Sequence, residues 1–232
     1  MSRPSSFAEI AAAIDRAPSV GRSLLAASID SRRDRAKSIA MATDPLRKFV
    51  RWHREAERAG APIADAMVLA TVDRAGRPSA RYVLLKGVDS RGFVFYTNER
   101  SRKGKELAAR PAAALAFYWH ETGRQVRVEG NVALVADSEA DAYWDTRPRG
   151  SQIASAVSQQ SRELASRASL LAAFRNLDRA SKGASLPRPE HWRGYVLAPR
   201  QIEFWTRREP RLHERELFVK KGGSWSRRAL QP

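Results

Sequence analysis

The chain has 232 residues, no cysteine and a formal net charge of +17. These values exclude a disulfide framework, a thiolate metal site and a cysteine nucleophile, and the length suits one domain of fair size or two small ones. The sequence shows neither an apolar run long enough to span a membrane nor the apolar core of a secretory signal. We therefore expect no membrane partner and a cytoplasmic location, with which the lack of cysteine is compatible.

The positive charge makes nucleic acid a partner to consider. Lysine and arginine are, however, spread along the whole chain, and no helix-turn-helix, zinc-finger or aromatic-rich RNA-binding signature accompanies them. We expect no sequence-specific nucleic-acid binding, while weak nonspecific adhesion stays open.

The first predicted elements are an arm and a helix. Residues 1–43 are rich in Ala, Ser and Arg, which indicates a loose N-terminal arm ahead of a main domain over 44–232. Asp44 and Pro45 are typical of a helix start, as cap and first helical residue. Apolar residues follow at helical spacing, and we interpret His53 on that face as a packed core histidine.

Short strands and turns dominate the rest of the chain. Strands are expected at 67–72, 81–87, 93–96, 112–119 and 125–135, and then at 194–205, 211–219 and 225–229. Helices are expected at 101–110, 138–147, 151–161 and 163–182. In the fifth strand Val126, Val128, Val132 and Leu134 share one face, and Gly130 between them indicates a bulge or a close approach. Tight turns between the strands predict an α+β fold with an antiparallel sheet curled into a barrel.

The helix after Asn98 begins with an unfavourable charge pattern. Ser101 is a good cap, but Arg102 and Lys103 occupy the first turn, where each cation opposes the helix dipole at about 0.3–1 kcal/mol. A phosphate at this helix start would reverse the sign, and Tyr96 and Thr97 offer it hydroxyls. The alternative is two solvated surface cations.

A second pattern indicates another anion site. Ser138 to Asp141 resembles a capping box, and Tyr143 and Arg147 follow four residues apart on one helix face. Pro148 ends that helix and Ser151 can cap the next one, so Arg147 and Ser151 would converge on one phosphate. A surface Tyr–Arg pair beside an ordinary cap is an equally good interpretation.

A third pattern lies near the C-terminus. In a strand, Arg211, His213 and Arg215 point the same way, and the aromatic residues Phe204 and Trp205 precede them. This arrangement suits a planar, negatively charged ligand. A basic strand edge that guards against aggregation would give the same triplet.

Several chemistries have no signature here. The sequence lacks Gly-x-Gly-x-x-Gly, P-loop and Gly-x-Ser-x-Gly motifs. The four histidines are far apart, so we expect no metal site, and no pair of carboxylates suits acid–base catalysis. A basic sheet protein with two phosphate sites therefore favours chemistry performed by a bound cofactor.

Seven stretches carry a resemblance to a known family, in the family's order between Asp44 and Pro232. They are RYVLLKG at 81–87, FYTN at 95–98 with SRKG at 101–104, RQVRVEG at 124–130, RPRGSQI at 147–153, QQS at 159–161, IEFW at 202–205 and RLH at 211–213. In these stretches the chain resembles the pyridoxamine 5′-phosphate oxidases, flavoproteins of vitamin B6 metabolism. The resemblance implies a homodimeric split β-barrel with FMN at the subunit interface. It also implies oxidation of pyridoxamine and pyridoxine 5′-phosphates to pyridoxal 5′-phosphate, with O2 reduced to H2O2.

The resemblance implies site residues as well. FMN contacts are implied for Arg81, Tyr82, Val83, Leu84, Leu85, Lys86, Tyr96, Thr97, Arg102, Lys103, Gln125, Gln160, Ser161, Trp205 and Arg215, with Arg81 and Lys103 on the FMN phosphate. A clamp on the substrate phosphate is implied for Lys86, Tyr143, Arg147 and Ser151. Arg211 and His213 are implied to lie over the substrate ring as the catalytic residues. Strict alternation puts Arg81 and Lys86 on opposite strand faces, so the strand must be bulged, be wrapped by the site, or offer its backbone.

Three departures from the family pattern concern the lid and the rate. The arm lacks the family's Arg-x-x-Tyr segment, residues 207–210 replace a Gly- and Asn-bearing loop, and Glu214 stands where Asp is typical. Two other functions stay open. One is a related flavin oxidase acting on another planar acid, such as a phenazine precursor, although such enzymes usually lack the clamp at 147–151. The other is a non-enzymatic protein that binds flavin, vitamin B6 or nucleic acid.

Overall fold

The computed structural model describes residues 44–181 and 183–232. The arm predicted over residues 1–43 lies outside the described residues. The described chain begins with helix α3 (Pro45–Arg58), where Asp44 accepts a hydrogen bond from Leu46 N at 2.9 Å and Pro45 is the first helical residue. The predicted helix start is therefore confirmed.

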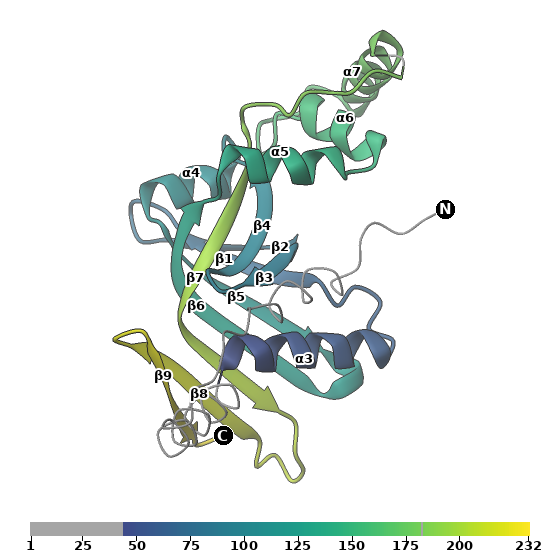
Figure 1. The fold of residues 1–232 in the computed structure, drawn as a ribbon. Helices are drawn as coiled ribbons and strands as arrows, with labels where there is room; N and C mark the ends of the chain where they lie inside the picture. Colours follow the sequence, from purple (N-terminus) through teal and green to yellow (C-terminus); the bar gives the residue numbers. More distant parts are fainter. Residues whose placement is uncertain (1–43, 182) are drawn as a thin grey trace, which may run out of the picture.

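Nine strands of the described chain form one antiparallel sheet, in the order β2-β1-β5-β6-β7-β4-β3, and β8 and β9 extend it beyond β7. Their bounds are β1 (Ala66–Val72), β2 (Pro78–Leu84), β3 (Gly87–Asp89), β4 (Gly92–Asn98), β5 (Ala112–Trp119), β6 (Arg124–Leu134), β7 (Trp192–Thr206), β8 (Glu214–Lys221) and β9 (Ser224–Leu230). The sheet curls around its core, with α3 across it (Figure 1). The predicted α+β fold with a curled antiparallel sheet is confirmed.

The remaining helices lie at the ends of the sheet. They are α4 (Arg102–Ala109), α5 (Asp137–Asp145), α6 (Arg149–Val157) and α7 (Arg167–Ala180), with a 3₁₀ turn at His120–Thr122. Figure 1 shows α5, α6 and α7 above one end of the curled sheet and the β8–β9 hairpin at the other end. This division separates two groups of predicted site residues.

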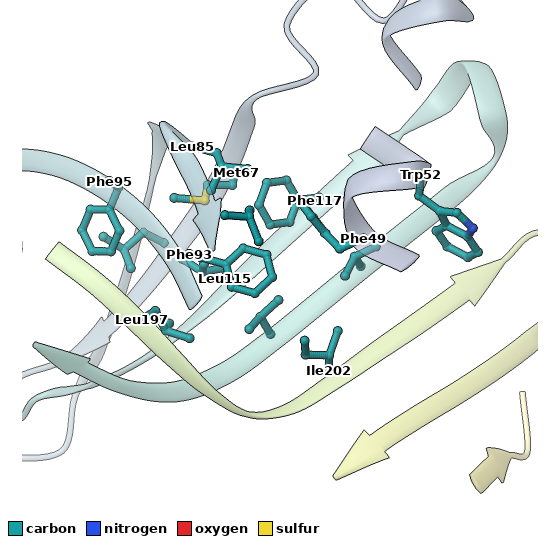
Figure 2. Packing of buried hydrophobic residues seen from close by; sticks show 14 of the residues in the cluster. Phe49, Trp52, Met67, Leu85, Phe93, Phe95, Leu115, Phe117, Leu197 and Ile202 are labelled. Carbon is teal, nitrogen blue, oxygen red and sulfur yellow. The ribbon is translucent and has the colours of Figure 1, made fainter. Parts of the chain in front are cut away.

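Aromatic side chains fill the core between α3 and the sheet. The Phe49 ring lies 4.8 Å from the rings of both Phe93 and Phe117, and all three side chains are fully buried (Figure 2). His53 is also buried, and its Nε2 lies 2.9 Å from Asp65 Oδ1. The interpretation of His53 as a core histidine is confirmed.

The bulge predicted at Gly130 is present. The register between β6 and β7 shifts between Glu129 and Gly130. A Cβ at Gly130 would lie 2.1 Å from the carbonyl oxygen of Ala198, so the two backbones approach too closely for any side chain. Leu134, expected on the buried face, is 52% exposed because the strand runs past the core at its end.

Candidate functional site

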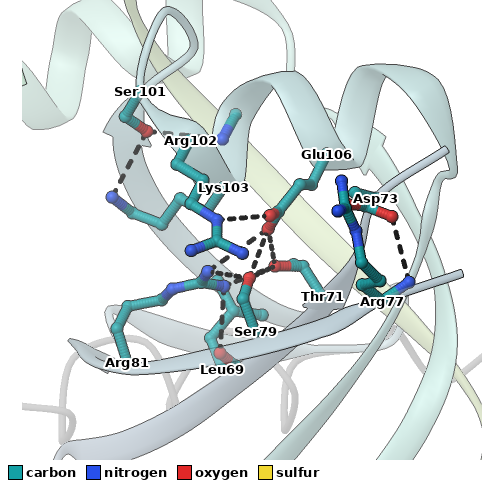
Figure 3. A network of polar contacts seen from close by, with 11 residues as sticks. Leu69, Thr71, Asp73, Arg77, Ser79, Arg81, Ser101, Arg102, Lys103 and Glu106 are labelled. Carbon is teal, nitrogen blue, oxygen red and sulfur yellow. Dashed lines mark hydrogen bonds and ion pairs between the residues drawn. The ribbon is translucent and has the colours of Figure 1, made fainter. Parts of the chain in front are cut away.

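Three cations gather where α4 packs over β1 and β2 (Figure 3). They are Arg81, Arg102 and Lys103, and we call them the cationic cluster. Ser101 caps α4 by accepting a hydrogen bond from Gly104 N at 3.3 Å, which confirms the predicted helix start. The cluster therefore faces the free N–H groups at the helix start, as an anion site requires.

Lys103 is the buried member of the cluster. Its side chain is 8% exposed, and Nζ donates to Ser101 Oγ at 3.3 Å and to Gln160 Oε1 at 2.9 Å. No carboxylate in the described part of the chain forms a salt bridge with it. Burial and the nearby positive charge of Arg81, partly opposed by Glu106, together lower the pKa of Lys103 to about 8. A buried ammonium with only neutral partners is a strong binding point for an anion.

Glu106 is a member of this region that the sequence motifs did not indicate. Its carboxylate is 5% exposed and accepts hydrogen bonds from Arg102 Nε at 2.9 Å, Ser79 Oγ at 2.7 Å and Arg81 Nη2 at 3.2 Å. The unfavourable charge of Arg102 at the helix start is thus offset by Glu106 one turn later, whereas that of Lys103 is not. The i,i+4 spacing of Arg102 and Glu106 is the signal that could have identified this pair.

A pocket of about 400 Å3 adjoins the cationic cluster. Gln160 lines the pocket and also contacts the cluster, because its Oε1 accepts a hydrogen bond from Lys103. Thr97, another lining residue, has its Oγ1 3.5 Å from the same oxygen. The lining residues are Tyr96, Thr97, Asn98, Arg147, Ser151, Ala154, Ser155, Ser158, Gln160 and Trp192. Three cofactor positions and two substrate positions of the predicted site therefore line one cavity. Ser161, beside Gln160, is exposed.

Arg147 lies in this pocket against aromatic rings. Its guanidinium carbon is 4.6 Å from the ring centre of Trp192 and 5.1 Å from that of Trp144, and Nη1 donates to Ser155 Oγ at 3.0 Å. Burial lowers the pKa of Arg147. Like Lys103, this cation has no salt-bridge partner among the described residues, so it too is suited to an anionic ligand.

The caps predicted around Arg147 are wrong. Helix α5 begins at Asp137 after Ala136, without a side-chain cap, because Ser138 lies inside the helix. Helix α6 begins at Arg149 directly after Pro148, whose fixed φ suits a helix start, so Ser151 lies in the first turn and is not the cap. Arg147 and Ser151 nevertheless line the same pocket, as the anion-site hypothesis required.

A stack of aromatic rings forms one wall of the pocket. The Tyr96 ring lies 4.2 Å from that of Tyr143 and 5.0 Å from that of Trp192, with interplanar angles of 18° and 8°. Gly194 makes room for it, because a Cβ there would lie 2.6 Å from Tyr96 Cε1. Burial raises the pKa of both tyrosines. Their hydroxyls therefore stay protonated and can donate hydrogen bonds at neutral pH.

Lys86 joins the group around Arg147. Burial lowers its pKa, the positive charge of Arg147 lowers it further, and Asp65 opposes the shift, so these groups lie close enough to interact. The predicted strand over 81–87 is wrong at its end. β2 stops at Leu84 and the short β3 begins at Gly87, so strict alternation does not reach Lys86. The apparent conflict between the faces of Arg81 and Lys86 is thereby removed.

The residues between Arg81 and Lys86 divide between surface and core. Tyr82 is 77% exposed and Leu84 is 45% exposed, whereas Leu85 is fully buried and Val83 packs partly against the core. Leu85 can contact a ligand only through its backbone, because its side chain is part of the core.

A second group of predicted residues lies across three strand ends. Gln125 on β6 pairs with Trp205 on β7, and Trp205 pairs with Arg215 on β8. We call these three residues the strand-end row. Arg215 Nε donates to the buried Glu203 at 2.8 Å, and the His213 ring lies 4.6 Å from that of Trp205.

The predicted strand over 211–219 is wrong at its start. β8 begins at Glu214, so Arg211 and His213 lie in the preceding loop and do not share a strand face with Arg215. Arg211 has a φ of 85° and is exposed. Pro210 and this positive φ turn the chain before the ladder resumes, which an alternation argument does not detect.

The two groups are far apart along one strand. Tyr96, Thr97 and Asn98 beside the cationic cluster pair with the beginning of β7, at Gly194 to Trp192, whereas the strand-end row includes Trp205 near its other end. At about 3.3 Å per residue, Trp192 and Trp205 are separated by roughly 40 Å along the strand. The pocket and the strand-end row of one chain therefore lie at opposite ends of β7.

Residues 44–181 and 183–232 contain no group of three or more His, Cys, Asp or Glu side chains that could hold a metal ion. None of the helices described is long and apolar enough to cross a membrane.

Comparison with known proteins decides the family. The family model described as "Pyridoxamine 5'-phosphate oxidase" matches residues 54–178, and one described as "Pyridoxine 5'-phosphate oxidase C-terminal dimerisation region" matches residues 192–232. The chain belongs to the pyridoxamine 5′-phosphate oxidase family. Curated members of this family include the pyridoxine/pyridoxamine 5′-phosphate oxidase of Rubrobacter xylanophilus, 52% identical over 82% of this chain and 87% of its own. That of Thermosynechococcus vestitus is 50% identical over 88% and 96%.

Solved structures related to the family share the architecture. PhzG from Burkholderia lata 383, in complex with tetrahydrophenazine-1-carboxylic acid, is similar with a TM-score of 0.79 and 36% identity, over 82% of this chain and 93% of its own. A pyridoxamine 5′-phosphate oxidase-related, FMN binding protein from Nostoc punctiforme has a TM-score of 0.67 and 21% identity, over 83% and 100%. The second likeness supports the fold alone.

Proposed function

We propose that this member of the family is an FMN-dependent oxidase that converts pyridoxamine 5′-phosphate and pyridoxine 5′-phosphate to pyridoxal 5′-phosphate, with dioxygen reduced to hydrogen peroxide. The observation that carries the proposal is a pair of neighbouring cation groups. Arg147 lines an aromatic pocket and Lys86 lies close to it, while Lys103 with Arg81 adjoins the same pocket through Gln160. Two phosphates, one on the cofactor and one on the substrate, require two such groups. Relatives about 50% identical over most of the chain support the same activity.

The cationic cluster fits the phosphate of FMN. Lys103 is buried with neutral partners, and Arg102 and Ser101 stand at the start of α4, where backbone N–H groups are free to donate. When bound, FMN accepts the hydrogen and two electrons removed from C4′ of the substrate and passes them to dioxygen. Thr97 and Gln160 adjoin both the cluster and the pocket, so they would fix the ribityl side of the cofactor.

Arg147, Lys86, Tyr143 and Ser151 fit the phosphate of the substrate. Both cations are partly desolvated and the Tyr143 hydroxyl is held protonated, so charge-assisted and neutral hydrogen bonds are available together. The planar guanidinium of Arg147, held between Trp192 and Ser155, is already oriented. Orientation before binding lowers the entropic cost of holding the substrate for hydride transfer.

A homodimer completes the site in this proposal. Trp205 of the strand-end row is roughly 40 Å along β7 from Trp192, which lines the pocket with Arg147. Two members of the row, Trp205 and Arg215, lie within the region that matches the C-terminal dimerisation model, so a partner subunit can supply the row. We propose that the row, Arg211 and His213 of one subunit cover the flavin and substrate ring held by the cationic cluster and pocket of the other.

The structural likeness to PhzG favours one second candidate, an oxidase acting on a phenazine-type acid. Such a substrate carries a carboxylate and no phosphate ester. Arg147 and Ser151 line one pocket and Lys86 lies close to Arg147. This arrangement is better matched to a dianionic phosphate, so we give the B6 substrates precedence.

The test begins with the purified protein. We expect flavin absorption bands, and pyridoxal 5′-phosphate and hydrogen peroxide formed in equal amounts from pyridoxine 5′-phosphate. Pyridoxine without phosphate should be turned over far less efficiently, mainly through a higher KM. Bound flavin with turnover of an unphosphorylated aromatic acid, but not of the B6 phosphates, would support the second candidate. A protein that binds no flavin would contradict both.

A further inference from the structure

Glu106 is a buried acidic residue within the proposed binding site for the FMN phosphate. It is a carboxylate at 5% exposure on the face of α4 that covers β1 and β2, beside the guanidinium groups of Arg81 and Arg102 (Figure 3). Four side chains donate to it, namely Thr71, Ser79, Arg81 and Arg102. Burial alone would raise its pKa, but these hydrogen bonds lower the pKa to about 2. The group is therefore ionised throughout the range in which the protein functions.

The network fixes the orientation of Arg81. Its Nη1 donates to Leu69 O at 3.2 Å and to Thr71 Oγ1, and its Nη2 donates to Ser79 Oγ and to Glu106 Oε2. The hydroxyls of Thr71 and Ser79 in turn donate hydrogen bonds to Glu106. The four terminal N–H groups are thus committed inside the protein. Among the described residues Arg81 Nε has no partner, so that edge is left for a ligand.

Arg102 is held in the complementary way. Arg102 Nε donates a hydrogen bond to Glu106 Oε1 at 2.9 Å. The two terminal nitrogens of Arg102 have no hydrogen-bond partner in the described chain. The side chain is 62% exposed, so only this contact restrains it. Without Glu106, Arg102 would lose its only contact, and Arg81 would lose the one carboxylate that opposes its charge beside Lys103.

We propose that Glu106 is a positioning residue for the flavin phosphate, which holds Arg81 and Arg102 in the orientation that binds the phosphate and leaves the site with two net positive charges. Three cations and one carboxylate give that balance, and a phosphate monoester carries about −1.5 to −2 at neutral pH. The inference rests on the proposed function. It adds that binding depends on an acidic side chain, which at first sight should repel the ligand.

The central test is the ratio of two dissociation constants. Glu106→Gln keeps the size and one acceptor but removes the charge, and flavin fluorescence quenching gives the Kd of the apoprotein for FMN and for riboflavin, which lacks the phosphate. We expect the Kd for FMN to rise roughly 10- to 100-fold, as for the loss of charged hydrogen bonds, and the Kd for riboflavin to change less than about twofold. Ser79→Ala, a milder change in the same network, should shift the ratio in the same direction.

Two comparisons isolate the role of Glu106. Asp178→Asn is the matched control, because Asp178 also holds an arginine, Arg149, at 3.1 Å, but neither residue lines the pocket or contacts the cationic cluster. It should leave both dissociation constants unchanged. Arg81→Lys should weaken FMN binding in the parent and add little in the Glu106→Gln background, since both changes remove the same positioning contact.

The outcomes separate this inference from the proposed function. Tighter FMN binding by Glu106→Gln would mean that charge repulsion dominates, and would overturn the inference. Equal losses for FMN and riboflavin would assign Glu106 a purely structural role, and would overturn it too. So would an unchanged ratio in both Glu106→Gln and Ser79→Ala. A parent protein that does not prefer FMN over riboflavin would instead contradict the proposed function itself.

Discussion

Lys103 Nζ lies 2.9 Å from Gln160 Oε1, and this contact joins the start of α4 to the segment that follows α6. Gln160 also lines the pocket that contains Arg147. The two proposed phosphate sites are therefore linked through one hydrogen bond from an ammonium to a neutral amide oxygen. That bond is also the one most directly replaced when an anion reaches Lys103.

The first prediction concerns pH. Burial holds the pKa of Lys103 at about 8 without ligand, and a phosphate dianion beside it would raise that pKa. Binding therefore takes up a proton as pH rises above about 8, so the Kd for FMN should increase between pH 8 and 9.5. Fluorescence titrations give the profile. Lys103→Arg should lose the dependence because arginine stays charged, and riboflavin should show little of it. A profile equal in Lys103→Arg and the parent would assign the titration to another group.

The same pKa predicts the opposite trend for stability. The pKa of Lys103 is about 8 in the folded apoprotein and about 10.4 in the unfolded chain. Between these two pH values the unfolded chain therefore binds more protons than the folded protein. The contribution of Lys103 to the free energy of unfolding should therefore rise with pH across this window. Comparison of the parent with Lys103→Met by denaturant unfolding measures it. A difference between the two proteins that does not vary with pH would contradict the assignment.

The second prediction separates Arg147 from Arg211. The substrate phosphate is remote from C4′ and unchanged by the reaction, so Arg147→Met should raise KM more than it lowers kcat. Arg211 and His213 are proposed to hold the substrate ring against the flavin, so Arg211→Met and His213→Ala should lower kcat. Steady-state kinetics with pyridoxine 5′-phosphate decides. If Arg147→Met lowered only kcat while Arg211→Met raised only KM, the two subsites would be inverted.

The third prediction tests whether the site is shared between subunits. In solution we expect a dimer of the 25.9 kDa chain. Lys103→Met damages the cationic cluster and Arg215→Gln damages the strand-end row, so each homodimer has two damaged sites. A mixed dimer, purified with two different tags, would combine both lesions in one site and leave the other intact. It should recover about half of the parent's tightly bound FMN and activity. No recovery would mean that each chain builds its own site.

The fourth prediction concerns the bulge between β6 and β7. Gly130→Ala would place a Cβ 2.1 Å from Ala198 O and 2.9 Å from Pro199 Cα, so the backbones must separate. We expect a loss of about 1–3 kcal/mol in the free energy of unfolding, as for other overpacked sites. Gly150→Ala is the control, because no heavy atom lies within 4 Å of the added Cβ and the residue is helical. The control should be neutral or stabilising. Equal effects of the two changes would contradict the close-approach argument.

Most of the fold could be predicted because local signals agreed with it. Asp44 and Pro45 begin α3, Ser101 caps α4, and the alternating valines of β6 face the core up to Val132. Element ends were less predictable. β2 stops at Leu84 and β8 starts at Glu214, although the residues beyond each end would suit a strand equally well. Those ends are set by pairing with β1 and β7, which is tertiary information.

The cations of the candidate site could be predicted from the sequence, but the acidic residues that pair with them could not. Arg102 and Lys103 were identified as an anomaly at a helix start, and Arg147 as one of a pair with Tyr143. The acidic residues that hold such cations were missed. Glu106 meets Arg81 across 25 residues and Glu203 meets Arg215 across 12. Such pairs depend on how strands and helices meet, and no spacing in the sequence shows that.

β7 has one further consequence. It begins with Trp192, against which Arg147 packs, and reaches Trp205, whose ring touches His213. In the proposed dimer each β7 strand would be a structural part of both active centres, one at each end. Two-fold symmetry then makes any change in the length or bend of this strand act on both centres at once. Insertions and deletions within β7 should for this reason disturb both centres together.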